Sequence, residues 1–222
     1  MPQRAPRPRA VLWDMDGTLV DSAEHHYEAW RATMAELGRT LSRNEFAATF
    51  GLRNDAILPR YLGTAVSAAD VQRIGDGKEA HYRDLVHARG VTALPGVREW
   101  LARLRAAGWR QAIASSGPRL NSETILAALG LEHALDAIIG AEDVVHGKPH
   151  PEVFLTAAAR LGVDPARCVV VEDAPTGIEA GRRGGMHTIG VLTTHPELDA
   201  DRTVRSLAEL EPHAFDALVG TP

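Results

Sequence analysis

Cysteine is nearly absent from this sequence, because Cys168 is the single cysteine among 222 residues. One thiol excludes an intramolecular disulfide and argues against a zinc site built from cysteines. Cys168 begins an apolar run, so we interpret it as a small buried hydrophobic residue. The ten histidines are scattered and lack the spacing of a metal-binding cluster.

Long apolar runs and an excess of positive charge are also missing. No stretch reaches the ~18 apolar residues that a membrane-spanning helix needs. The apolar segment after the basic, proline-rich residues 1–8 meets Asp14 too soon for a signal-peptide core. The net charge is 24 − 29 = −5, so no global positive field attracts nucleic acid or an anionic membrane. We expect a cytoplasmic protein with a loose N-terminal tail and neither of these partners.

The remaining composition is that of a globular protein, with 45% hydrophobic and 24% charged residues. Short apolar runs that resemble buried strands occur at 9–13, 110–114, 135–139 and 167–171, with a weaker one at 186–191. Segments typical of helices alternate with them, at 97–107, 120–129, 152–161 and 176–183. This alternation predicts an α/β core with a doubly wound, Rossmann-like parallel sheet and helices on both faces.

Residues 22–90 interrupt the alternation, because they are helical in character and contain no convincing strand. We interpret them as a helical insertion after the first strand. The turn signal Pro95-Gly96 marks the return to the core. The predicted organisation is therefore a core of residues 1–20 and 93–222 with a helical cap at 21–92.

The first of four chemically informative motifs is Asp14-Met15-Asp16-Gly17-Thr18-Leu19, directly after a predicted strand. Two carboxylates two positions apart in extended backbone point to the same side, so both can face one site. Gly17 allows a sharp turn there. The alternative, a solvated turn after a strand, stays open for this motif alone.

Two further motifs follow predicted strands and carry phosphate-binding chemistry. Ser115 and Ser116 lie in a small-residue loop whose hydroxyl and backbone N–H groups suit a phosphate oxygen. Ser115 could instead cap the next helix. Lys148 lies between a glycine and a proline and offers a compact positive charge for a phosphoryl group, unless it is a surface lysine in a turn. We interpret His146 and His150 beside it as loop residues rather than ligands.

The fourth motif contains two adjacent acids, Glu172 and Asp173, after an apolar strand. Paired carboxylates repel each other unless a cation lies between them. Mg²⁺ explains the pair, because it needs only one or two carboxylates together with substrate oxygens and water. An N-cap role would explain Asp173 and leave Glu172 without a role. All four motifs fall at carboxyl ends of strands, where open parallel sheets bind ligands.

In this order, the four motifs resemble those of the haloacid dehalogenase superfamily of phosphohydrolases, within its β-phosphoglucomutase-like branch. The resemblance extends from Ala10 to about Leu210, and the helical insertion resembles the mobile cap of that branch. Dehalogenases of the superfamily lack the second aspartate, whereas Asp16 is present here. The resemblance therefore implies a phosphorylated substrate.

By this resemblance, Asp14 attacks phosphorus and forms a transient aspartyl-phosphate. Asp16 protonates the leaving oxygen and then deprotonates the attacking water or hydroxyl. Mg²⁺ is held by Asp14, the backbone carbonyl of Asp16 and Asp173, with Glu172 as a ligand or bound through water. Mg²⁺ and Lys148 together offset the crowding of negative charge.

The resemblance also assigns candidate substrate-binding residues. Ser115, with Ser116 beside it, is expected to bind a phosphoryl oxygen. Ser22, His26 and Trp30 match the first cap helix, where His26 either assists the acid/base residue or is a plain surface residue. Gly51 matches a cap loop that reaches over the site, and Lys78 matches a cap lysine.

The cap departs from the mutase pattern beside Gly51. Phe50 stands where mutases carry a lysine, and Asn54 stands where they carry an arginine, although Arg53 is adjacent. Those basic residues would hold the distal phosphate of a bisphosphate intermediate. We therefore expect a Mg²⁺-dependent phosphatase acting on a small phosphorylated metabolite such as a sugar phosphate. The alternatives are a β-phosphoglucomutase-type mutase and a catalytically idle binding protein, and a monomer is the default expectation.

Overall fold

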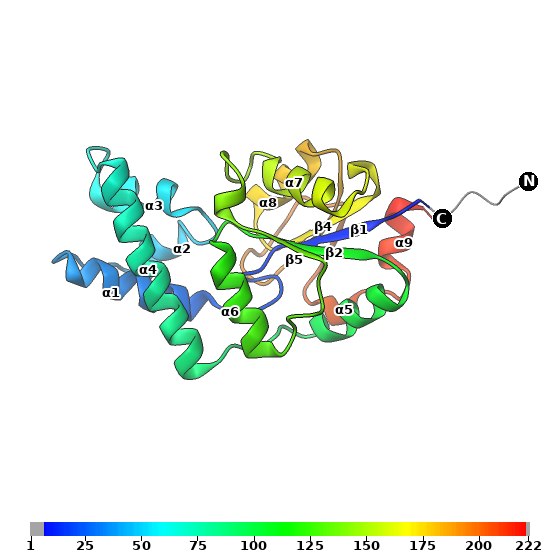
Figure 1. Ribbon diagram of the computed structural model, residues 1–222, viewed down its shortest axis with the longest axis horizontal. Coiled ribbons are helices and arrows are strands. Elements are labelled where there is room, and N and C mark those ends of the chain that lie inside the picture. The colour runs from blue at the N-terminus through cyan, green and yellow to red at the C-terminus, as the bar shows by residue number, and fades with distance from the viewer. Residues whose placement is uncertain (1–6, 221–222) are drawn as a thin grey trace, which may run out of the picture.

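The computed structural model describes residues 7–220, which are built around one six-stranded parallel sheet (Figure 1). The strand order is β3-β2-β1-β4-β5-β6. The strands are β1 (Ala10–Trp13), β2 (Arg110–Ala114), β3 (Ala137–Ile139), β4 (Cys168–Glu172), β5 (His187–Val191) and β6 (Arg202–Val204). Because β1 lies between β2 and β4, the loops that follow these three strands meet at one edge of the sheet.

Helices cover both faces of the sheet, and each face has its own hydrophobic core. Successive strand residues point to opposite faces, so Trp13 and Leu12 of β1 belong to different clusters. The cluster with Trp13 includes α5 (Val97–Ala106), α6 (Arg119–Leu129) and α9 (Ala214–Val219). The cluster with Leu12 includes α7 (Glu152–Leu161) and α8 (Pro175–Arg183). The predicted doubly wound α/β fold is confirmed.

Of the five helices described between β1 and β2, the first four lie at one end of the molecule (Figure 1), namely α1 (Ala23–Glu36), α2 (Arg43–Ala47), α3 (Asn54–Leu62) and α4 (Ala68–Arg89). Residues such as Trp30, Phe46 and Leu58 form a separate hydrophobic cluster among them. The chain leaves and re-enters the core at one place, where Val20 and Ala93 form a β-bridge. This geometry agrees with a cap at 21–92, although the exact domain boundaries stay a prediction.

Local sequence explains how two cap helices, α2 and α4, begin. The hydroxyl of Ser42 accepts the N–H of Glu45, and the Glu45 carboxylate accepts the N–H of Ser42, which forms a capping box at the start of α2. Ser67 caps α4 in the same way by accepting the N–H of Asp70. Helix α4 ends at Gly90.

The predicted elements differ from the observed ones mainly at the C-terminal edge. β6 was not predicted, because the short, half-exposed Arg202–Val204 has no apolar run. The short helix α9 was not predicted either. The predicted 135–139 strand begins only at Ala137. Three short 3₁₀ segments occur at Ala141–Asp143, Pro165–Arg167 and Leu207–Glu209.

The predicted loose tail, residues 1–8, lies mostly outside the described residues. Of that segment the structure describes Arg7 and Pro8, whose carbonyls accept hydrogen bonds from the Arg167 side chain at 3.2 and 3.1 Å. Over residues 7–220, no helix combines the length and apolar character needed to cross a membrane.

Candidate active site

Asp14 and Lys148 form the centre of the candidate site. Asp14 is the first residue after β1, and its backbone N–H donates to the carbonyl of Val171 at 3.0 Å, which fixes its position beside β4. The ammonium of Lys148 donates to Oδ1 of Asp14 at 2.5 Å and to Oε1 of Glu172 at 2.7 Å. The Lys148 side chain is 4% exposed. The alternative of a surface lysine in a turn is therefore wrong.

Glu172 and Asp173 lie beside this pair and are held by different partners. Oε2 of Glu172 accepts the backbone N–H groups of Asp173 and Ala174, at 3.0 and 2.9 Å. Asp173 accepts a hydrogen bond from Thr18 at 3.3 Å and another from the hydroxyl of Thr194. Helix α8 has Ala174 as its N-cap. The N-cap role considered for Asp173 is therefore wrong.

Two glycines allow the acids to pack this closely. Gly17 has a positive φ of 85°, and a Cβ built there would lie 2.1 Å from Oδ2 of Asp173. A Cβ on Gly177, in the first turn of α8, would lie 1.8 Å from Oε1 of Glu172. Both distances are far below van der Waals contact, so neither position accommodates a larger residue without moving an acid.

Three of these acids form a site that fits a divalent cation. Asp14, Glu172 and Asp173 are all buried, and each offers an oxygen within 4.8 Å of the others. Hard cations such as Mg²⁺ prefer such oxygen ligands. The carboxylate of Asp16 is not a member of this group, and a role for its backbone carbonyl in metal binding stays a prediction. The chemistry of the donor set therefore fits the expected Mg²⁺.

The acids carry more negative charge than Lys148 alone balances. Burial raises the pKa of Asp14 well above its usual range, and the carboxylates of Glu172 and Asp173 raise it further against the opposing effect of Lys148. Burial and Glu172 raise the pKa of Asp173 to about 7. Burial would lower the pKa of Lys148, but Asp14 and Glu172 raise it above its usual value, so Lys148 stays charged. A further cation would stabilise the ionised acids.

Asp16 has surroundings of its own at the junction with the cap. Its Oδ1 accepts the hydroxyl of Ser22 at 2.5 Å and lies 3.1 Å from Nε2 of His26 and 3.4 Å from the hydroxyl of Tyr82. Burial alone would raise the pKa of Asp16, but the charge and hydrogen bond of His26 and the Ser22 hydroxyl lower it to about 2. His26 is buried, stacks on Tyr82 and contacts Asp16. A plain surface role for His26 is therefore wrong.

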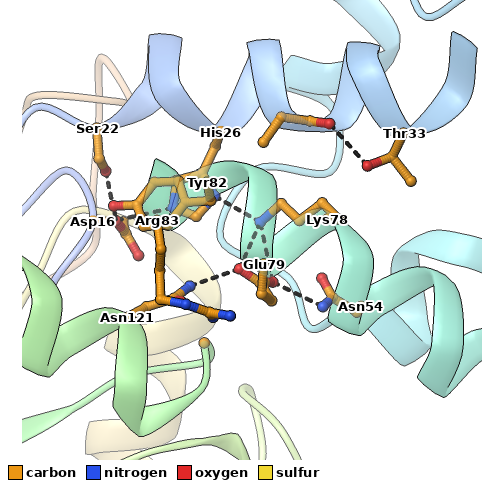
Figure 2. A network of polar contacts seen from close by, with 12 residues as sticks. Asp16, Ser22, His26, Thr33, Asn54, Lys78, Glu79, Tyr82, Arg83 and Asn121 are labelled. Carbon is orange, nitrogen blue, oxygen red and sulfur yellow. Dashed lines mark hydrogen bonds and ion pairs between the residues drawn. The ribbon is translucent and has the colours of Figure 1, made fainter. Parts of the chain in front are cut away.

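A chain of polar contacts continues from His26 through the cap to α6 (Figure 2). The ammonium nitrogen of Lys78 lies 2.8 Å from Nδ1 of His26 and 3.1 and 3.2 Å from the two carboxylate oxygens of Glu79. Glu79 also accepts the side-chain amides of Asn54 at 2.8 Å and Asn121 at 2.6 Å. Asn121 belongs to α6, so this chain connects the cap to the core.

The serine loop after β2 faces the same pocket. Ser115 is buried, its N–H donates to the carbonyl of Ile139 at 3.0 Å, and its hydroxyl accepts the N–H of Gly117 at 3.0 Å. Helix α6 begins at Arg119 with Pro118 as its N-cap and has no side-chain cap. The alternative that Ser115 caps this helix is therefore wrong.

One pocket collects nearly all the residues singled out from the sequence. Its lining includes Asp14, Asp16, Ser115, Ser116, Lys148, Glu172 and Asp173 from the core and His26, Gly51 and Lys78 from the cap. Gly51 is exposed and lies in the loop between α2 and α3. His146 and His150 are not among the lining residues and pack against each other, with ring centroids 4.7 Å apart.

Several polar residues of this site were missed by the sequence reasoning. Thr194 follows β5, and its place after a predicted strand was a usable signal. Tyr82, Glu79 and Asn121 lie inside predicted helices, where nothing in the local pattern distinguishes them from surface residues. Only the packing of α4 against α6 brings them together.

Comparison with known proteins gives matches to one family of hydrolases and to its relatives. The family model of haloacid dehalogenase-like hydrolases matches residues 8–185. The chain is 36% identical over 208 residues to hexitol phosphatase B of Escherichia coli (strain K12), covering 90% of this chain and 93% of the relative. It is 32% identical over 208 residues to β-phosphoglucomutase of Bacillus subtilis (strain 168), covering 91% of each.

A solved structure shares the fold over most of the chain. The CbbY protein of Rhodobacter sphaeroides in complex with xylulose-(1,5)bisphosphate superposes with a TM-score of 0.84 at 27% identity. The match covers 91% of this chain and 96% of that one. The similarity therefore includes both the sheet and the helices between β1 and β2.

Proposed function

The chain belongs to the haloacid dehalogenase-like hydrolases, and we propose that it is a Mg²⁺-dependent phosphatase that hydrolyses a small sugar or sugar-alcohol phosphate. One observation carries this proposal. Two carboxylates with contrasting surroundings, Asp14 beside Lys148 and Asp16 beside His26, line one pocket next to a cation-binding group of acids. This combination suits the transfer of a phosphoryl group to a carboxylate.

In the proposed first step, an oxygen of Asp14 attacks phosphorus, and the bond between phosphorus and the ester oxygen breaks. Asp16 gives its proton to the departing alkoxide, so the alcohol leaves neutral. His26 and the Ser22 hydroxyl hold the pKa of Asp16 at about 2 against the effect of burial. A bound phosphate places negative charge nearby and raises this pKa, which favours the protonated form.

In the second step, Asp16 takes a proton from water while the water oxygen attacks the phosphorus of the aspartyl-phosphate. The bond between phosphorus and Asp14 breaks, which releases orthophosphate and regenerates the Asp14 carboxylate and the protonated Asp16. Lys148 and the Ser115 loop hold the phosphoryl oxygens in place. When bound by Asp14, Glu172 and Asp173, Mg²⁺ supplies positive charge against the phosphoryl oxygens.

The cap favours hydrolysis over mutation. A mutase must hold a second phosphate while a bisphosphate intermediate turns over, and Phe50 and Asn54 provide no charge for this. Arg53 is directed to the core, where it donates to the carbonyls of Ala141 and Val144 at 3.1 and 3.3 Å. The hexitol phosphatase relative supports hydrolysis, whereas the β-phosphoglucomutase relative keeps the mutase as the second candidate.

Two assays test this proposal. Phosphate release is measured with Mg²⁺ on an aryl phosphate and on a panel of sugar and sugar-alcohol monophosphates. Turnover of either excludes the catalytically idle binding protein, and release of orthophosphate from a sugar phosphate supports the hydrolase. Interconversion of β-glucose 1-phosphate and glucose 6-phosphate without loss of phosphate would instead establish the mutase.

A further inference from the structure

Lys78 lines the pocket on the cap side, but its ammonium group is fully occupied by protein atoms. An ammonium group has three N–H donors. Three atoms surround the Lys78 nitrogen, the two oxygens of Glu79 at 3.1 and 3.2 Å and Nδ1 of His26 at 2.8 Å, which accepts when His26 is neutral with its proton on Nε2, toward Asp16. Lys78 is 2% exposed. No donor of Lys78 is left for a substrate while Glu79 keeps this position.

Glu79 is itself fixed by side-chain amides from two other helices. Asn54, from the start of α3, donates to Oε1, and Asn121, from α6, donates to Oε2. Arg83 donates to the amide oxygen of Asn121 at 3.0 Å, which turns the Asn121 amide nitrogen toward Glu79 (Figure 2). Burial alone would raise the pKa of Glu79, but Lys78, His26 and the two amides lower it, so Glu79 is ionised.

The rest of the cap wall offers no substitute for the Lys78 charge. Its other lining residues are largely apolar, namely Trp30, Phe46, Phe50, Leu52 and Ile57. Lys78 and Lys148 are the only basic residues other than His26 that line this pocket in the described part of the chain. Lys148 lies on the core side, where it is engaged by Asp14 and Glu172.

The neighbouring hollow is acidic rather than basic. It shares Asn54, Glu79 and Ser116 with the pocket, and its lining adds the carboxyl groups of Asp55, Asp76 and Glu142. Arg53 also lines it, but its guanidinium pairs with Asp55 at 3.2 Å in addition to its contacts with backbone carbonyls. A second phosphate entering from this side would meet carboxylates.

We infer that Glu79 determines specificity by holding Lys78 away from the substrate, so that the pocket accepts phosphomonoesters whose far end is uncharged. This inference rests on the proposed function. It adds that the end of the substrate far from the reacting phosphate is uncharged. A phosphate dianion buried against an apolar wall without a cation loses its hydration uncompensated. A polyol end loses far less. In this inference Lys78 supports His26 and does not bind substrate, whereas the sequence predicted a substrate-binding role for Lys78.

The first test uses the unaltered protein with Mg²⁺ and paired esters, fructose 1-phosphate with fructose 1,6-bisphosphate and glucose 6-phosphate with glucose 1,6-bisphosphate. For the better monophosphate, kcat/KM is expected to exceed that of its bisphosphate by at least about tenfold, the scale of one unpaired buried charge. Equal values, or a preference for the bisphosphate, would overturn the inference.

The second test releases Lys78 with Glu79→Gln, which keeps the shape of the side chain and removes its charge. The ratio of kcat/KM for the monophosphate to kcat/KM for its bisphosphate is expected to fall about tenfold, because the freed Lys78 ammonium can pair with a distal phosphate. Glu79→Gln/Lys78→Met should restore the high ratio. Asp84→Asn, an exposed acid on the same helix, is the matched control. An unchanged ratio in a folded Glu79→Gln protein contradicts the inference.

A spectroscopic measurement reports the state of Lys78 without relying on turnover. Lys78 and Lys148 are the two lysines of the chain, so a protein labelled with ¹⁵N at lysine Nζ gives two side-chain signals. Adding fructose 1,6-bisphosphate to Glu79→Gln is expected to shift the Lys78 signal, and adding it to the unaltered protein is not. A Lys78 shift of equal size in both proteins would contradict the inference.

Failure of the proposed function gives a different result from failure of this inference. If neither these four esters nor the aryl phosphate and the monophosphate panel are hydrolysed, the hydrolase proposal fails. Dissociation constants from calorimetry then decide the inference by the same criterion, because tighter binding of the monophosphate by about tenfold supports it and equal binding opposes it.

Discussion

The ammonium nitrogen of Lys148 lies 2.5 Å from Oδ1 of Asp14, which joins a loop after β1 to a loop that precedes α7. Lys148→Met keeps the length of the side chain and removes its charge. We expect kcat to fall by about 10²–10³-fold, as when one preorganised donor is removed from a site of developing charge. The measurement is steady-state phosphate release with saturating Mg²⁺.

The control for Lys148 is an exposed cation. Arg160 is 51% exposed and lies 3.8 Å from Asp143, and such pairs contribute little. Arg160→Met should leave kcat unchanged. A Lys148→Met enzyme within about threefold of the unaltered rate would remove Lys148 from the chemistry.

The crowded acids predict that stability depends on pH and on Mg²⁺. Burial raises the pKa of Asp173 from 3.8 to about 7, so between these values the folded state holds this proton more tightly than the unfolded state. The contribution of Asp173 to the free energy of unfolding therefore falls as pH rises through that window. One pKa unit is worth about 1.4 kcal/mol, so a fall of about 2 kcal/mol or more is expected in EDTA.

Urea unfolding at several pH values measures this dependence. Millimolar Mg²⁺ should flatten it, because the ion stabilises the ionised acids, and Asp173→Asn should flatten it without metal. The difference between the two profiles isolates the contribution of Asp173, because all other groups are common to both proteins. Parallel pH profiles for the unaltered and Asp173→Asn proteins in EDTA would rule out this electrostatic account.

Gly177 tests how closely α8 packs against Glu172. A Cβ at Gly177 would lie 1.8 Å from Oε1 of Glu172, so Gly177→Ala must displace the carboxylate or the helix. Overpacking of this kind costs about 1–3 kcal/mol, and we expect weaker Mg²⁺ activation as well. Gly77→Ala in α4, where nothing lies within 4 Å of the new Cβ, should be neutral or slightly stabilising. Thermal unfolding and Mg²⁺ titration of both variants distinguish them, and equal behaviour would count against the packing argument.

His26 is expected to act through Asp16. His26→Gln removes the imidazole that lies 3.1 Å from Oδ1 of Asp16 and helps to orient its carboxylate, so proton transfer to and from Asp16 should slow. We expect kcat to fall by about tenfold or more, a part of the 10²–10⁴-fold that a positioned proton-transfer group supplies. KM should change less. The same substitution at His25, which contacts the carbonyl of Gly90 at 3.0 Å, should affect stability alone. Equal effects of both substitutions on kcat would exclude a specific role for His26.

The strand-end residues could be predicted from the sequence because a parallel sheet brings the carboxyl ends of its strands to one edge. Asp14, Ser115 and Asp173 each follow an apolar run that ends in polar residues, and this pattern depends on neighbours along the chain only. The buried position of Cys168 followed from the same reasoning and is confirmed.

The cap side of the site could not be derived in this way. Glu79 and Asn121 are polar residues on helices, a pattern typical of solvent-exposed faces, and they are buried only because α4 packs on α6. The contact of Lys78 with His26 depends on the packing of α4 against α1. Cytoplasmic location, the monomeric state and a substrate contact by Gly51 stay predictions.

The central claim is that Asp14 is the group that becomes phosphorylated. The most direct measurement is Mg²⁺-dependent phosphate release by Asp14→Asn, with Asp21→Asn, a nearby exposed acid, as its control. We predict that Asp14→Asn loses activity by about 10⁴-fold or more while it remains folded, and that Asp21→Asn keeps the unaltered rate. Activity of folded Asp14→Asn near that of the unaltered protein would contradict the account.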